Sequence, residues 1–442
     1  MKKKVNLLAI NLNEINYRFI IQEAKRFNCR NIINFLNKKK INTYTNDKIQ
    51  HKNLDPWVQN VSISTGFSSK THKIFNLGEQ LDNNRIQIWD LLCKKKYSCS
   101  VWGPMNAKLI KNNNMKIFFP DPWNFLSKPY PKFLNDFFYL PNYYAKNYLN
   151  VKFIKFFLYS LIFIKQFLLQ TKLFLYFVKN SLFFIKFFFS SNSKNFIMFI
   201  IFDIISVILL KNLNKKRTDF SIIFLNSIAH FQHNNWDERK SFKSFFLLLE
   251  KLFEQLNELE KKYDSIIIYN GFTQKKIATE YLIRPINPEN FIKNLNINFK
   301  KIEQNMTNGA LIFFGNNFDK ANAIKILKHY KFFGYKVFEV KNINKYTIFY
   351  KIKIKFKEKN FIEKINKINR NKIIKYYNKN NKIYSYNDSN KSFYNNIKLI
   401  KTTGDHHYKG LLFYKNINNP FKKGRIIVNH HIFKIICNHF KI

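Results

Sequence analysis

The stretch that decides the fold covers residues 220–236 and reads FSIIFLNSIAHFQHNNW. Its first part is a continuous apolar run, which predicts a strand buried on both faces of a sheet. Asn226, His230 and His233 follow directly, where the strand is expected to end. Open α/β sheets keep their binding sites at the carboxyl ends of their strands. The stretch therefore predicts part of a site; the alternative is an ordinary polar loop.

Two more apolar runs, residues 5–10 and 266–269, predict strands of the same kind. Asn13 follows the first run and Asn270 follows the second. A parallel sheet brings the ends of its strands to one edge, so Asn13, Asn226 and Asn270 are expected to line one cleft. For Asn13 alone, a helix N-cap is the simpler interpretation. The predicted fold class is α/β, with a mostly parallel sheet flanked by helices.

The spacing Asn226-x-x-x-His230 resembles the D-x-x-x-H loop of the alkaline phosphatase superfamily, in its type I phosphodiesterase and nucleotide pyrophosphatase branch. Residues 65–66 (TG) and 72–74 (HKI) match the frame of that family near its nucleophile. Residues 404–407 (GDHH) resemble its closing G-x-H segment and are expected to form a loop before a core strand. The matches occur in the order that the family has, so the resemblance implies an alkaline-phosphatase-like fold.

In that superfamily, Asp and His residues at these strand ends bind two metal ions. Here Asn13, Asn226 and Asn270 stand where the resemblance implies Asp, and Gly271 stands where it implies His. Asn lacks the carboxylate charge that helps to hold divalent ions. The resemblance therefore implies a reduced site with a single divalent ion, such as zinc. The ligands that remain for it are His230 and His406, with His233 and Asp405 as substitutes.

The nucleophile of the family, a Thr or Ser at a helix N-terminus, has no match, because its position falls near Pro56 and Trp57. Ser62 and Ser64 are the nearby hydroxyl groups and become the candidates for catalysis. Both lie on a predicted helix, where a packed or solvated structural role is the favoured alternative. Asp121 lies between two prolines and predicts a turn, with a substrate contact as its alternative.

Residues 141–215 are dominated by Phe, Leu and Ile. Lysines recur there at positions 165, 172, 179 and 186, which places them on one stripe of a helix. The remaining apolar run, 195–210, is short for a membrane span and has Asp203 at its middle, a costly position in lipid. The segment predicts a helical cap insertion over the mouth of the site. A membrane-surface helix, and hence peripheral membrane contact, is the alternative.

The chain is expected to have an interrupted core. The core parts are residues 1–140, 216–290 and 401–442, separated by the helical cap insertion, 141–215, and by a small α+β insertion with a low-complexity tail, 291–400. Residues 357–398 supply that tail, rich in Lys, Asn and Tyr.

The charge composition of the chain limits the kinds of molecule that it is expected to bind. The formal net charge is +49, but the lysines are spread along all 442 residues and no nucleic-acid-binding motif accompanies them, so nucleic acid is not expected. A basic field attracts anionic small molecules, glycans with acidic groups and membrane headgroups. Four cysteines without a C-x-x-C pair, and a start without a cleavage signal, predict a cytoplasmic protein.

Two functions from different classes follow. The first is a phosphodiesterase- or phosphatase-like enzyme that acts on a phosphate or sulfate ester through a one-metal site built on His230, His233 and His406. The second is a non-catalytic relative that binds a phosphorylated or glycan ligand in the same cleft. The resemblance also implies a role in surface-polysaccharide metabolism. The metal content of the purified protein distinguishes the two functions.

Overall fold

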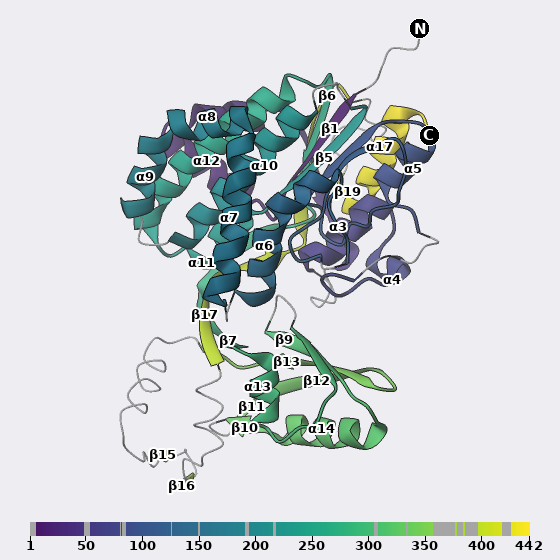
Figure 1. Cartoon of the computed structure of the whole chain (residues 1–442), viewed down its shortest axis with the longest axis vertical. Coiled ribbons are helices and arrows are strands. Elements are labelled where there is room, and N and C mark those ends of the chain that lie inside the picture. Colours follow the sequence, from purple (N-terminus) through teal and green to yellow (C-terminus); the bar gives the residue numbers. More distant parts are fainter. Residues whose placement is uncertain are drawn as a thin grey trace. The chain divides into compact units, whose positions relative to one another are not determined.

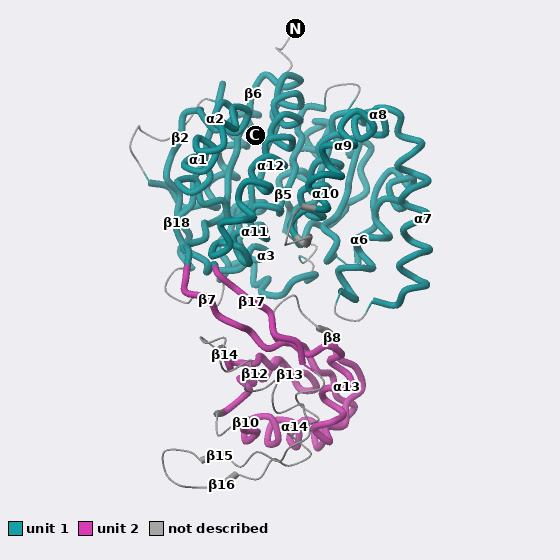
Figure 2. Tube along the Cα trace, turned by 90° about the vertical axis from the view of Figure 1, so that its left-hand side faces the viewer, with its two compact units in different colours: residues 1–276, 404–442 teal, residues 277–403 magenta. Residues whose placement is uncertain are grey.

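The computed structural model describes residues 6–47, 54–79, 81, 85–124, 126–148, 151–190, 194–214, 218–304, 308–332, 335–356, 376–377, 383–384, 397–417 and 426–442. The chain forms two compact units, shown in different colours in Figure 2. Unit 1 consists of residues 1–276 and 404–442, and unit 2 consists of residues 277–403.

Unit 1 is built on an eight-stranded sheet in the order β19-β2-β18-β6-β1-β5-β3-β4. The central strand β1 pairs in parallel with β5 and β6, and the parallel run continues through β3 to β4. Only β18, among these strands, runs antiparallel to its neighbours β2 and β6. The predicted mostly parallel sheet, with three apolar runs side by side, is confirmed. The strands are β1 (Leu7–Leu12), β2 (Lys39–Tyr44), β3 (Cys99–Trp102), β4 (Met115–Phe119), β5 (Phe220–Leu225), β6 (Ser265–Tyr269), β18 (Lys409–Lys415) and β19 (Ile427–Val428).

Helices cover both faces of this sheet (Figure 1). Side chains alternate between the faces of a strand, so Ile10 and Ile223 contribute to one core while Ala9 and Ile222 contribute to the other. The helices of the first core include α1 (Tyr17–Arg26), α2 (Arg30–Leu36), α10 (Lys194–Leu213), α11 (Ser227–Asn234) and α12 (Arg239–Glu260). Those of the second are α3 (Pro56–Thr65), α5 (Ile88–Lys94) and α17 (Ile432–Phe440).

The segment expected to form a cap, residues 141–215, is helical and belongs to unit 1. It contains most of α6 (Asn135–Asn147), then α7 (Phe153–Leu169), α8 (Thr171–Lys179), α9 (Ser181–Ser190) and α10. Over Phe196–Leu213, α10 is long and apolar enough to cross a membrane, but 61% of that window is buried inside the protein. The helix packs against α12, so it is a core helix. A cap over the site stays a prediction for the helices before it.

Asp203, at the middle of α10, has a structural role that the sequence did not show. Its Oδ2 accepts hydrogen bonds from the backbone N–H groups of Asn226, at 3.1 Å, and Ser227, at 2.9 Å. These groups lie at the start of α11, where backbone donors lack partners within the helix. Burial raises the pKa of Asp203 to about 7, although both hydrogen bonds oppose the shift. A side chain of α10 thereby holds the N-terminus of α11 in place.

Unit 2 is a small α+β structure with its own core, which includes Ile312, Ile348 and Tyr350. Its main sheet has the order β12-β13-β9-β8. The strands and helices are β7 (Thr273–Pro285), α13 (Pro288–Lys293), β8 (Lys301–Gln304), β9 (Gly309–Phe313), α14 (Asn317–His329), β10 (Lys331–Phe332), β11 (Tyr335–Lys336), β12 (Phe338–Asn344), β13 (Thr347–Ile352), β14 (Lys355–Phe356) and β17 (Ile397–His407). Residues 273–276 of β7 and 404–407 of β17 belong to unit 1. The predicted low-complexity tail lies outside the described residues, apart from β15 (Tyr376–Tyr377), β16 (Ile383–Tyr384) and the start of β17.

Replacing Asp203 by Asn should stabilise the protein at pH 8 much more than at pH 4. The amide oxygen of Asn can accept both backbone hydrogen bonds, and the charge that burial disfavours is gone. A carboxyl whose folded pKa is raised loses stability as the pH rises from its unfolded value, about 3.9, towards its folded value. Because that folded value is about 7, the gain at pH 8 should be on the order of a few kcal/mol.

Urea unfolding at the two pH values measures this difference. Asp203→Ala serves as the control, because it removes both hydrogen bonds together with the charge and should be less stable than Asp203→Asn at either pH. An Asp203→Asn effect that does not change between pH 4 and pH 8 would contradict the assigned role.

Candidate metal centre

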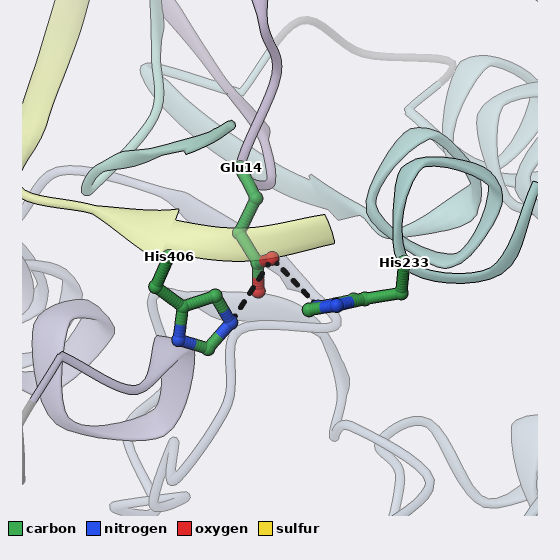
Figure 3. A group of neighbouring side chains, drawn as sticks. All are labelled: Glu14, His233 and His406. Carbon is green, nitrogen blue, oxygen red and sulfur yellow. Dashed lines mark ion pairs between the residues drawn. The ribbon is translucent and has the colours of Figure 1, made fainter. Parts of the chain in front are cut away.

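Three titratable side chains meet beside the sheet of unit 1 (Figure 3). Glu14 follows β1, His233 lies near the end of α11, and His406 lies near the end of β17. Nε2 of His233 is 3.0 Å from Oε2 of Glu14, and Nε2 of His406 is 3.3 Å from the same oxygen. One ligand atom from each of the three residues lies within 4.8 Å of the other two. The fold thus joins side chains that are far apart in the sequence.

The backbone at Glu14 has an unusual conformation. Its φ is 56°, in the left-handed region that side chains of this size rarely adopt. Two glutamines hold this turn, because the main-chain oxygen of Glu14 accepts hydrogen bonds from Nε2 of Gln232, at 2.9 Å, and from the N–H of Gln274, at 3.1 Å. The result is a carboxylate turned into the protein, with 2% of its side chain exposed.

Several donors surround the Glu14 carboxylate. Nε2 of Gln274 donates to Oε2, and Nδ2 of Asn13 donates to Oε1 at 3.2 Å. Burial favours the neutral acid, but His406 and His233 outweigh burial and hold the pKa of Glu14 well below its usual range. Glu14 is therefore ionised at neutral pH.

The charge of Glu14 acts in turn on His406. Burial works against a positive charge on this ring, but the nearby carboxylates, Glu14 first, outweigh burial and raise the pKa of His406 to about 9. Nε2 of His406 is buried and, although 3.3 Å from Glu14, is not aligned to form a hydrogen bond with it. Among the described residues, this nitrogen has the Glu14 carboxylate as an ion-pair neighbour but no aligned hydrogen-bond partner.

This set of donors fits a divalent metal ion. Two imidazoles and one carboxylate are the protein ligands of a common class of catalytic zinc site, in which a fourth position stays open. Ligand atoms that each lie about 2.0–2.1 Å from a tetrahedral zinc ion are about 3.3 Å from one another. The distances of 3.0 and 3.3 Å from the Glu14 oxygen to the two imidazole nitrogens match that spacing.

The surroundings of the three residues also fit a bound divalent metal ion. Nδ1 of His406 faces Oδ1 of Asp55 at 3.9 Å, and a carboxylate at the second ring nitrogen is the usual partner of a metal-bound histidine. The exposed fraction of the side chain is 21% for His406, 27% for Asp55 and 32% for His233. Since Glu14 is buried, an ion held here would be closed off on the Glu14 side and accessible from the histidine side.

Asn13, Asn226 and His230, all predicted for the site, form a chain of hydrogen bonds that leads away from Glu14. Nδ2 of Asn13 donates to Oδ1 of Asn226 at 2.6 Å, and Nδ2 of Asn226 is 3.2 Å from Nε2 of His230. The His230 ring stacks on Phe199 with centroids 3.6 Å apart. Burial, aided by His233, lowers the pKa of His230 to about 3. His230 is outside the three-residue group, and its role as a ligand stays a prediction.

Asn270 supports the backbone near the site. Its Nδ2 donates to the carbonyl of Ile15 at 3.0 Å, and its Oδ1 accepts from the N–H of Leu411 at 2.7 Å. Asp405 is exposed and precedes His406 on a strand, so the two side chains point to opposite faces. The prediction of a loop at residues 404–407 was wrong. These residues form the end of β17 and pair within a sheet.

Ser62 and Ser64 are buried on α3. Nδ1 of His72 accepts a hydrogen bond from the N–H of Ile74 at 3.0 Å, so the proton of a neutral His72 is on Nε2, 2.9 Å from Oγ of Ser62. That nitrogen donates to Ser62 and is not placed to remove its proton. Both hydroxyls donate to carbonyls of their own helix, which fits the structural alternative. Asp121 likewise accepts from the N–H of Trp123 at 2.8 Å, as a turn residue does.

Glu14 was not among the residues predicted for the site from the sequence. The acidic position was expected at Asn13, but β1 continues to Leu12 and the chain then turns through Glu14. The available signal was an acidic residue next to Asn13 between a strand and a helix. The three-residue group contains Glu14 and does not contain Asp405, whose role as a substitute ligand stays a prediction.

No protein-family model matches the chain. No curated protein matches it either. Solved structures similar to it include phosphonoacetate hydrolase from Sinorhizobium meliloti 1021, with 9% sequence identity, a TM-score of 0.41, and coverage of 99% of this chain and 96% of that one. Human ectonucleotide pyrophosphatase/phosphodiesterase 5 has 9% identity, a TM-score of 0.42, and coverage of 100% and 95%. A variant of TAB5 alkaline phosphatase with magnesium bound has 10% identity, a TM-score of 0.39, and coverage of 99% and 97%. These similar structures belong to the superfamily that the sequence resembles.

Gly404→Ala should disturb the group formed by Glu14, His233 and His406. A Cβ at Gly404 would lie 2.6 Å from the main-chain oxygen of Gln232 and 2.6 Å from Oε1 of Gln274. Both glutamines hold Glu14, so we expect a loss of about 1–3 kcal/mol in the free energy of unfolding together with weaker metal binding. Calorimetric unfolding and metal titration measure the two effects.

Gly315→Ala is the matched control, because nothing lies within 4 Å of a Cβ at that position. It should leave both quantities unchanged. If the two variants behave alike, the close approach of β17 to the glutamines does not support the site.

Proposed function

We propose that this protein is a metal-dependent hydrolase of a phosphate ester, with one divalent ion bound by Glu14, His233 and His406. The observation that supports the proposal is the meeting of three ligand atoms at zinc-site spacing in a partly exposed position. A single ion is favoured because Asn13 and Asn226 bond to each other through their amides and add no further carboxylate. The basic charge of the chain and its resemblance to the alkaline phosphatase superfamily favour a phosphate ester over other substrates.

A divalent ion at this position supplies positive charge that polarises a phosphoryl oxygen. Glu14 would hold it from the buried side, while His233 and His406 would leave the solvent side for the substrate. Asp55, at the N-cap of α3, is placed to orient the His406 ring through Nδ1. Because the raised pKa of His406 keeps the ring protonated at neutral pH, metal binding must release that proton.

Isothermal titration with Zn²⁺ and with Mn²⁺ tests the metal site. We expect one ion per chain, with an affinity that increases as the pH rises from 7 towards 9, since fewer protons then have to be displaced. Glu14→Gln and His406→Ala should each abolish binding. His407→Asn is the matched control, because His407 follows on the same strand and is outside the group of three. Unchanged binding in Glu14→Gln would contradict the proposed site.

Hydrolysis of p-nitrophenyl phosphate, bis-p-nitrophenyl phosphate and p-nitrophenyl sulfate tests the activity. We expect the metal-loaded protein to cleave a phosphate ester, and EDTA to remove the activity reversibly. Faster cleavage of the sulfate would assign the protein to sulfate esters. A bound ion without hydrolysis of any of the three would contradict the enzyme and favour a protein that binds a phosphorylated or glycan ligand. A role in surface-polysaccharide metabolism and a cytoplasmic location stay predictions.

A further inference from the structure

The helices α7, α8 and α9 present an unusual concentration of exposed apolar side chains. Of the 26 large apolar side chains that are exposed among the described residues, 16 lie between residues 151 and 189. Leu182 is 82% exposed, and Phe153 and Phe189 are each 77% exposed. Monomeric soluble proteins rarely keep large contiguous apolar patches in water. The set of exposed residues on these three helices, called the α7–α9 surface below, therefore requires an explanation.

These helices dock on the rest of unit 1 through few residues. Leu173 of α8 and Phe184 and Phe187 of α9 are buried in the main core. On α7, Phe163 packs edge-on against Phe137 of α6, and most of the remaining side chains are exposed or half-buried. Figure 2 shows α7 at the edge of unit 1, away from the sheet. The exposed positions of α7 form one stripe, which runs through Phe153, Phe157, Leu161, Ile164 and Leu168.

The charge of this region has a single sign. No Asp or Glu occurs from residue 137 to residue 202, whereas lysines occur at positions 146, 152, 155, 165, 172, 179, 186 and 194. Lys172 and Lys179 are exposed seven residues apart on α8, beside the exposed Leu175. Lysine keeps its charged end in water while its stem covers apolar surface. Apolar residues bordered by lysines are typical of helices that lie in the interface of an anionic membrane.

The geometry favours a surface position over a membrane span. α7 has 17 residues, which is about 25 Å of helix and shorter than the hydrocarbon core of a bilayer. The chain then bends by 95° into α8, so the two helices do not form one straight span. A second copy of this chain on the same surface would bring two all-positive faces together, which is unfavourable. An anionic lipid surface can take up the apolar side chains in its acyl region and pair the lysines with its phosphates.

We propose that the α7–α9 surface binds the face of an anionic phospholipid bilayer, with its apolar side chains in the headgroup and acyl boundary and its lysines against lipid phosphates. The sequence alternative of a membrane-surface helix is thereby extended from one helix to three. The proposal does not depend on the metal centre.

Sedimentation of the full-length protein with sucrose-loaded vesicles tests it. We expect binding to vesicles of phosphatidylcholine with phosphatidylglycerol, and much weaker binding to phosphatidylcholine alone. Phe153→Glu and Leu182→Glu should each lower the partition coefficient by about tenfold, which corresponds to about 1.4 kcal/mol. Both side chains are exposed, so the unfolding temperature should not change. The matched control is Phe318→Glu on α14, where the side chain is 80% exposed and should not affect binding.

The lysines are tested separately. Lys172→Gln combined with Lys179→Gln should weaken binding only to vesicles that contain phosphatidylglycerol, whereas Lys325→Gln with Lys328→Gln, two exposed lysines of α14, should have no effect. The proposal is overturned if Phe153→Glu and Leu182→Glu bind as the natural protein does. It is also overturned if the protein does not bind vesicles and these variants instead dissociate a dimer, or if only detergent releases it from a bilayer.

Discussion

The site depends on one buried charge, the carboxylate of Glu14. An ionised carboxylate taken out of water costs several kcal/mol unless opposite charges and hydrogen-bond donors surround it. Here the compensation comes from His233 and His406 together with amide groups of Asn13 and Gln274. Each belongs to a different part of the chain, so the turn after β1, the helix α11 and the strands β7 and β17 must come together for Glu14 to be tolerated. A strained backbone at Glu14 persists because those partners hold it.

The central strands could be predicted from sequence because β1, β5 and β6 are unbroken apolar runs, as strands buried on both faces must be. His233 could be expected near the site for the same reason, since polar residues after such strands gather at one edge. His406 was expected there through the family resemblance, because it lies at the end of β17 and precedes the core strand β18. Glu14 could not be predicted with the same rule. Its place in the site results from a left-handed turn, which is decided by hydrogen bonds to glutamines more than 200 residues away in sequence.

Composition alone could not show which of the Phe-rich helices are buried and which are exposed. Residues 153–190 and the helix α10 are similarly apolar, yet α10 is buried against α12 while α7–α9 remain exposed. From the sequence, Asp203 was interpreted as an obstacle to a membrane span. In the structure its carboxylate caps the N-terminus of α11. The lysines of α7, α8 and α9 indicate a solvent or interface environment. A buried charge needs a protein partner, whereas a charge at an interface needs only water or an anion.

Anomalous diffraction at the zinc edge, from crystals grown with zinc, can locate an ion bound jointly by Glu14, His233 and His406. We expect a single peak in this group, about 2.0–2.1 Å from Nε2 of His233 and Nε2 of His406 and at a similar distance from Oε2 of Glu14. A peak on other residues, or none in this group although the crystals contain zinc, would contradict this expectation.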